Sequence, residues 1–338
     1  MPHGITATDG LAYVGERPWH GLGTLVEGQA MTAAQAIEAA GLDWEVDTQP
    51  VYTRQIKELE MAIDWFYKEI PRRRAVVRQD TQEVFGVVGD QYTPVQNQTS
   101  CDVLDAVVGT GDATYHSAGS LWGGRRVFFL AKLMGDYELD NGEKLDSYIL
   151  LDNSHDGRTA MRMRLTTVRV VCSNTLTMAT AKQAAWRARH SPSILGRVNE
   201  ARDLLGLNAA YMARYMAECN RLADEAFSHQ AMESLTRDLL HLDPAKGLGG
   251  QRGHMADSAE GMVSLFERGR GNRGETKWDA FNAVTEFVDH HRVTSSVDVD
   301  MPDTPVVVEH RRTNSWFMPY GERMRAKAWE SLTTTPVN

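Results

Sequence analysis

The sequence has few cysteines and no long hydrophobic run, and each absence excludes a class of protein. Its 338 residues contain three cysteines, Cys101, Cys172 and Cys219, which form no CxxC pair. An odd number of widely spaced cysteines argues against a disulfide framework and a zinc knuckle, so we expect reduced thiols. No apolar run approaches the roughly 20 residues of a membrane-spanning helix, and the first residues do not resemble a secretory signal. We therefore expect a cytoplasmic protein with no membrane partner.

Acidic residues are missing from one long segment, although the whole chain has a formal net charge of −9. Between Gly157 and Asn199 there is no Asp or Glu, where the chain average would place roughly six. The segment is instead basic, with Arg158, Arg162, Arg164, Arg169, Lys182, Arg187, Arg189 and Arg197. Such a charge distribution is informative about partners rather than about the fold.

Familiar enzyme signatures are also absent, because no P-loop, GxSxG, GxGxxG or HExxH pattern occurs. We therefore predict no cofactor and no catalytic residue. A metal-dependent enzyme acting on nucleic acid stays open as an alternative. In that case His155 and Asp156 of "SHDG", with Glu286 and His290 of "TEFVDHH", would ligate the divalent ion.

The clearest structural signal is a period-two pattern in the first half of the chain. It predicts four strands in antiparallel meander order, at 113–122, 125–133, 145–152 and 159–171. The turns between them are marked by Gly123-Gly124, Asn141-Gly142 and the stretch 154–157. Before these strands, "RRRAVVRQDTQEVFGVVG" predicts two more, joined at Asp80-Thr81.

Helices are predicted on both sides of this meander. Thr32 caps a short helix with Gln35 at the capping-box position, and Gly41 ends it. "VQNQTSCDVLDAVVG" indicates a second helix, and "NTLTMATAKQAAWRARH" a third that Ser173 or Asn174 would cap. The period is also helical over 194–240, on both sides of a Gly/Arg loop at 268–274, and near the C-terminus.

These elements predict an α+β fold in which an antiparallel β-meander packs with helices and a mostly helical C-terminal part follows. We divide the chain into an N-terminal segment with a short helix and a strand, an α+β core with a basic face, a helical region, and a linker with the C-terminal helix. The corresponding ranges are 1–60, 61–192, 193–293 and 294–338.

The basic residues of the core suggest a surface for nucleic acid. On a strand, Arg162 and Arg164 share one face and Met163 the other, so we expect both arginines to point outward beside Arg158. Guanidinium groups with an aromatic neighbour suit a phosphate backbone with unstacked bases. The alternative is a solvated face balanced by acids from elsewhere in the protein or from an acidic partner.

Further candidates extend this surface. The expected third helix would place Lys182, Trp186 and Arg189 on one side, with Arg187 beside them. The segment 113–135 has no acid but contains Arg125, Arg126 and Lys132, with Trp122 as another stacking candidate. In "RGRGNRG", glycines separate Arg268, Arg270 and Arg273 and would let the backbone approach a phosphate or a second subunit. A merely flexible loop is the alternative for that segment.

Several of these motifs together resemble a known family. "PWHGLGT", "AGLDWEV", the spacing of 117–127, "SHDG", "VRVVCSNTL" and the stretch ending in "NAVTEFVDHH" resemble a phage- and plasmid-borne family defined as a domain of unknown function. The resemblance runs from about Pro18 to Trp329 and implies a bacterial host cytoplasm, but no particular activity. The element order and the basic face are also similar to phage single-strand annealing proteins, which form rings on DNA.

The sequence thus predicts a phage- or plasmid-type protein that binds or anneals single-stranded DNA in replication or recombination, and that is a possible homo-oligomer. A metal-dependent nucleic-acid-processing enzyme is the first alternative. A host-interaction protein, whose basic face meets an acidic protein and not nucleic acid, is the second.

Overall fold

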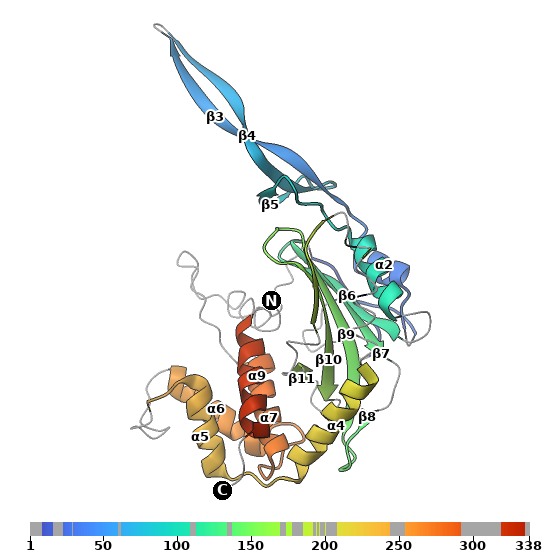
Figure 1. Ribbon diagram of the computed structural model, residues 1–338, viewed down its shortest axis with the longest axis vertical. Helices are drawn as coiled ribbons and strands as arrows, with labels where there is room; N and C mark the ends of the chain where they lie inside the picture. Colours follow the sequence, from blue (N-terminus) through green and yellow to red (C-terminus); the bar gives the residue numbers. More distant parts are fainter. Residues whose placement is uncertain are drawn as a thin grey trace.

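The computed structural model shows an α+β protein with an antiparallel meander and a mostly helical C-terminal region, as the sequence predicts (Figure 1). The structure describes residues 9–15, 23–28, 30–59, 62–108, 113–133, 137–169, 174–177, 185–191, 194, 196, 200, 208–243, 254–291 and 319–334.

The main sheet confirms the predicted meander. Its central strands are β6 (Ala113–Leu121), β7 (Arg126–Leu133), β9 (Lys144–Ser154) and β10 (Met161–Arg169), each antiparallel to its neighbour. Beyond β6 lie β1 (Leu11–Tyr13) and β2 (Thr24–Leu25), and the short β8 (Tyr137–Glu138) pairs with β9. The predicted turns have the backbone they need, since Gly123, Gly124, Gly142 and Gly157 all have positive φ.

Two helices cover one face of this sheet (Figure 1). Helix α1 (Ala33–Ala39) begins with the predicted capping box of Thr32 and Gln35, and α2 (Asn97–Val108) follows the arm described below. Side chains on this face of β7, β9 and β10 are buried, for example Phe129, Leu151 and Met163. One part of the hydrophobic core therefore lies between this face and the two helices, and the core continues into the C-terminal helices through residues such as Met212 and Trp278.

The helix expected between Asn174 and His190 is wrong. The described part of this segment forms two strands, β11 (Asn174–Thr177) and β12 (Ala185–Ala188), which pair with successive parts of β10. The alternation of small or charged residues with apolar ones in "AWRA" fits an edge strand, and pairing with β10 outweighs the helical propensity of its alanines.

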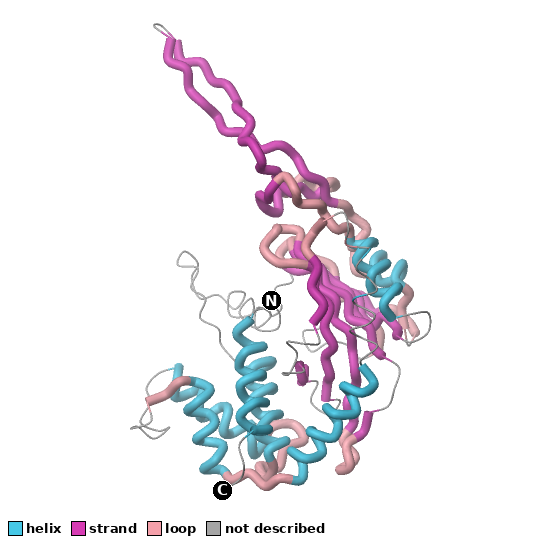
Figure 2. The backbone as a smooth tube through the Cα atoms, in the orientation of Figure 1, coloured by secondary structure: helices cyan, strands magenta, loops and turns pink. Residues whose placement is uncertain are grey.

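A second, three-stranded sheet forms an arm that projects from the main sheet (Figures 1 and 2). It contains β3 (Val46–Leu59), β4 (Ala62–Arg78) and β5 (Val84–Gly89), with the predicted turn between β4 and β5. The ladder between β3 and β4 runs from the pair Val46–Arg78 to the pair Leu59–Ala62. The length of this hairpin was not predicted.

The helical region packs at the other end of the main sheet. Its helices are α4 (Asn208–Asp224), α5 (His229–Leu240), α6 (His254–Arg268), α7 (Lys277–Glu286) with the π-helical turn η3 (Phe287–His291), and α9 (Pro319–Thr334). Trp278 Nε1 donates a hydrogen bond to Glu143 (2.9 Å), and the backbone N–H of Asp140 donates one to Asn220 (3.0 Å). Among the described helices, none has the length and hydrophobicity needed to cross a bilayer.

The junction between the arm and the main sheet makes a stability prediction. Gly157 has a φ of +74°, and a Cβ there would lie 2.5 Å from Val88 Cγ1 on β5. We expect Gly157→Ala to lower the free energy of unfolding by about 2–5 kcal/mol, from left-handed strain plus steric overlap. Gly142→Ala is the control, because Gly142 has a φ of +85° and no described atom within 4 Å, so only the strain of about 1–2 kcal/mol applies. Equal losses in urea denaturation would show that Gly157 does not pack against the arm.

Candidate functional site

A buried ionic cluster lies on the face of the main sheet opposite α1 and α2. The carboxylate of Asp152 on β9 is completely buried and accepts hydrogen bonds from Arg126 on β7 (2.5 Å) and Arg162 on β10 (3.0 and 3.1 Å). Arg164 lies within 3.4 Å of its other oxygen. Burial alone would raise the pKa of Asp152, but the charges of the three arginines outweigh it and keep this pKa below its usual value.

The cluster corrects the expectation that Arg162 and Arg164 point outward. The predicted alternation along β10 is right, because Met163 faces the core and the two arginines share the other face. However, Arg126, Arg162 and Arg164 are all buried. The reason is Asp152, which lies directly opposite Arg162 on the neighbouring strand and draws the guanidinium groups together. These three arginines are therefore part of the protein's internal structure.

The proposed stacking residue Trp186 is also buried. It lies on β12 opposite Met163 and faces the core, because strand alternation replaces the helical spacing that would have exposed it. Arg187, the next residue, is exposed on the opposite face, and so is Arg189. Trp122 is partly buried against the small cluster of Leu11 and Leu121. Lys182 lies outside the described residues.

The "SHDG" motif forms the β9–β10 turn of the main sheet, which packs against the base of the arm. His155 is completely buried, its Nε2 lies 2.9 Å from Asn97 Oδ1, and its ring packs edge-on against Trp44. Asn97 Nδ2 donates to the carbonyl oxygen of Leu42, so its Oδ1 is the acceptor and His155 Nε2 carries the proton. His190 Nδ1 contacts the hydroxyl of Tyr92 at 2.5 Å. His155 thus contacts the start of α2 and Trp44 just before β3, and His190 contacts Tyr92 just after β5.

The structure does not assemble the alternative metal site. His155 and Asp156 lie in the β9–β10 turn, where the carbonyl of Asp156 packs against Gly86 of the arm. Glu286 instead accepts a hydrogen bond from the backbone N–H of Arg270, in the helical region. The side chain of His290 lies outside the described residues. Within the described ranges, no three His, Cys, Asp or Glu side chains are grouped as a metal would require.

An exposed set of arginines, which sequence reasoning missed, lies on β4 near the base of the arm. Between the pairs Pro50–Arg74 and Tyr52–Glu69, β4 contains three residues more than β3, so the strand bulges. Pro71 lies in this bulge, where its lack of an N–H costs no ladder hydrogen bond. Arg72 has a φ of +59°, unusual for a residue other than glycine, and its side chain is largely exposed. The run "RRR" at 72–74 was the available sequence signal.

Other exposed arginines lie around the same base. Arg158 follows Gly157, which contacts Val88, and Val88 pairs with Arg74. Arg125 belongs to the β6–β7 turn, where its carbonyl accepts a hydrogen bond from the N–H of His155 (2.8 Å). Arg189 precedes His190, which bonds to Tyr92 just after β5. We call this set the junction surface: Arg72, Arg73, Arg74, Arg125, Arg158, Arg187 and Arg189.

Ion-pair geometry separates the junction surface from the buried cluster. Arg72 lies 3.8 Å from Asp90, Arg74 3.8 Å from Glu69, and Arg158 3.6 Å from Asp156. These three pairs are longer than hydrogen bonds, whereas Arg125 donates a hydrogen bond to Glu83 (3.1 Å). All four arginine side chains are accessible to solvent and such pairs are worth about 0–1 kcal/mol, so exchanging them for phosphate costs little. Removing an arginine from buried Asp152 would cost about 3–5 kcal/mol. Of these two sets, the junction surface therefore has the arginines that a ligand can recruit at little cost.

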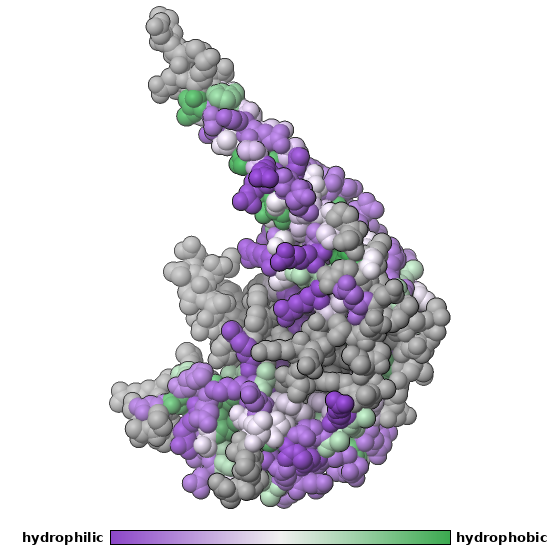
Figure 3. All heavy atoms as spheres, in the orientation of Figure 1, coloured by the Kyte–Doolittle hydropathy of each residue, from purple (hydrophilic) through white to green (hydrophobic). Residues whose placement is uncertain are grey.

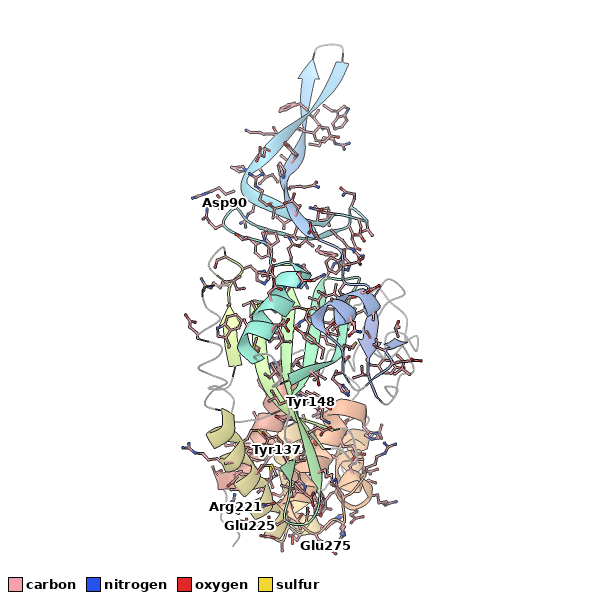
Figure 4. The ribbon with its side chains drawn as sticks, turned by 90° about the vertical axis from the view of Figure 1, so that its right-hand side faces the viewer. Asp90, Tyr137, Tyr148, Arg221, Glu225 and Glu275 are labelled. Carbon is pink, nitrogen blue, oxygen red and sulfur yellow. The ribbon has the colours of Figure 1, made fainter. Side chains whose placement is uncertain are left out.

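The "RGRGNRG" loop lies far from this surface. Figure 4 shows Asp90, the partner of Arg72, at the base of the arm, and Glu275, which directly follows the loop, at the opposite end of the molecule. The loop backbone is anchored, because Asn272 Nδ2 donates to the carbonyls of Leu265 (2.9 Å) and Asp279 (3.2 Å). Arg268, Arg270 and Arg273 are exposed on it. The loop is thus a separate candidate contact, ordered rather than merely flexible.

Across the described residues, the fold is that of an α+β protein with a nine-stranded main sheet and a projecting three-stranded arm. The chain belongs to the family described as "Domain of unknown function (DUF932)", whose sequence model matches residues 84–313. The matched region begins at β5 and includes the meander, the buried cluster and the helical region through η3. No curated protein and no solved structure matches the chain.

The two buried histidines predict a loss of stability in acid. Burial, reinforced for His155 by the charge of His190, lowers the pKa of His155 to about 3, and burial lowers that of His190 to about 4. Between these values and the ordinary histidine pKa near 6.5, the unfolded chain binds protons that the folded protein does not. The free energy of unfolding should therefore fall as pH falls from about 6.5 to 4.

Urea denaturation at several pH values measures this effect. His155→Gln keeps a donor for Asn97 but removes one titrating group, so its stability should change less steeply with pH, by about one proton. An unchanged slope in this variant would contradict the assignment of His155 as a buried neutral group.

Proposed function

We propose that this protein binds nucleic acid through the junction surface, with single-stranded DNA as the favoured form. One observation supports the proposal above the others: exposed arginines from β4, the β6–β7 turn, the β9–β10 turn and β12 lie together at the base of the arm of an acidic protein. Phosphate groups recruit such cations and release counterions, which favours binding.

The free energy needed to break the existing ion pairs favours the junction surface as the site. Arginines in long, exposed ion pairs can turn to a phosphate with little loss, while the arginines around Asp152 cannot. A role in annealing or protecting single strands in phage or plasmid replication rests on the similarity in element order to annealing proteins. The alternative of a metal-dependent enzyme has no comparable support, because no metal-binding group of side chains is found among the described residues.

The salt dependence of binding tests the proposal. Arg158→Gln combined with Arg189→Gln should weaken binding to a fluorescent oligothymidine and lower the slope of log affinity against log salt by about 1.4, since each lost phosphate contact contributes about 0.7 for single strands. Fluorescence anisotropy over a series of salt concentrations measures both quantities.

The matched control is Arg268→Gln with Arg273→Gln, which changes the net charge equally at the far end of the molecule. We expect this control to retain the wild-type slope. If the control loses as much affinity as the junction variant, then overall charge or the loop determines binding. The assignment of the junction surface as the binding site would then be wrong. Absence of binding by the wild-type protein at low salt would refute the function itself.

A further inference from the structure

The outer half of the arm is a two-stranded ribbon that extends beyond the rest of the described protein (Figures 1 and 2). From Tyr52 to Leu59, β3 pairs only with β4, since β5 ends its pairing at Arg73. An isolated two-stranded hairpin is only marginally stable in water. Contacts made by its exposed side chains are therefore expected to contribute to its stability. Hydrophobic and hydrophilic residues follow one another along the arm in Figure 3.

The pairing of the two strands sorts large side chains onto one face. On one face, Arg54 lies opposite Tyr67 and Glu69 lies opposite Tyr52. Strand alternation places Tyr52, Ile56, Trp65 and Tyr67 together on that face, where Ile56 lies opposite Trp65. Their exposed fractions are 52%, 56%, 48% and 71%. The other face of the same segment has Thr53, Gln55 and Lys68, with Phe66 as its large apolar residue. We call the first set the aromatic face.

The aromatic face has a size and a spacing that suit unpaired bases. Trp65 and Tyr67 are two residues apart on one strand, which separates them by about 7 Å, and Tyr52 lies diagonally across from Tyr67 at about 7–8 Å. The guanidinium of Arg54 lies over the Trp65 ring, 4.2 Å from its centroid, so a cation occupies one face of this ring and a base would stack on the other. Aromatic rings at such intervals on a β-surface, flanked by cations, are a recurring platform for single strands.

A second copy of the chain fits this face less well than a single strand does. At roughly 200 Å² for a large side chain, four half-exposed ones offer about 400 Å². Two such faces would bury about 800 Å², below the roughly 1,200–2,000 Å² of stable interfaces. The aromatic face instead leads to the junction surface, because β4 runs from Trp65 and Tyr67, past Glu69 and the bulge, to Arg72 and Arg74.

We infer that the aromatic face stacks the bases of a single strand whose phosphates are bound at the junction surface, so that the arm selects unpaired over paired DNA. This inference rests on the proposed function. A duplex keeps its bases stacked inside and can use only the cations, whereas a single strand can use the cations and the rings. The strand would run along the arm toward the main sheet.

Comparing one oligothymidine with a duplex of the same length in anisotropy titrations tests the inference in the full-length protein. Tyr67→Ala and Trp65→Ala should each weaken single-strand binding about 5- to 150-fold, the range for losing one stacked base. Duplex binding should change less than twofold. Tyr67→Phe should restore single-strand binding, because it returns the ring without the hydroxyl.

Phe66→Ala is the matched control, since Phe66 lies between these residues on the opposite face and is 44% exposed. It should leave both affinities unchanged. If Phe66→Ala loses as much single-strand affinity as Tyr67→Ala, or if the aromatic variants lose single-strand and duplex binding equally, the stacking inference is wrong. If light scattering shows that Tyr67→Ala lowers the molar mass, the face is instead a contact between copies.

These results are distinguishable from a failure of the proposed function. If the wild-type protein binds neither DNA, both proposals fail. If it binds DNA with the junction variant impaired and the aromatic variants unaffected, the junction surface stands and the inference about the arm fails.

Discussion

The contact that the rest of the structure depends on is the buried carboxylate of Asp152 with three guanidinium groups. Ions buried without partners cost several kcal/mol each, so these charges are tolerated only in mutual contact. Arg126, Asp152 and Arg162 belong to three adjacent strands, and the contact fixes the register among them. A slip by one residue would place Asp152 on the core face among side chains such as Phe129 and Met163.

This contact also divides the basic residues into two sets with different consequences. Arginines around Asp152 bind its buried carboxylate, whereas Arg72 and Arg158 at the base of the arm lie in long ion pairs that a phosphate can replace. His155 and Gly157 connect the two sets, because the turn that contains them follows β9 and packs against the arm. The geometry of the proposed interface therefore depends on the same meander that buries the charges. The arm then extends this interface toward exposed aromatic rings.

Local signals explain what could be predicted from the sequence. The turns at Gly123-Gly124 and Asn141-Gly142 and the capping box at Thr32 each act within a few residues, so the meander and α1 were predictable. The outer half of the arm was not, because Trp65, Phe66 and Tyr67 are consecutive and charges lie on both faces, which removes the period-two signal. The burial of Arg162 was missed because its partner Asp152 precedes the acid-free segment and reaches it only through strand pairing.

The most direct test compares two arginines that lie opposite each other on neighbouring strands, Arg162 on β10 and Arg187 on β12. Unfolding free energy and single-strand affinity should be measured for Arg162→Gln and Arg187→Gln. Arg162→Gln should lose about 3 kcal/mol of stability while its folded protein keeps wild-type affinity. Arg187→Gln should stay within about 0.5 kcal/mol in stability and lose affinity, with a salt slope lower by about 0.7. A stable Arg162→Gln with impaired binding, beside an Arg187→Gln that binds normally, would contradict the account.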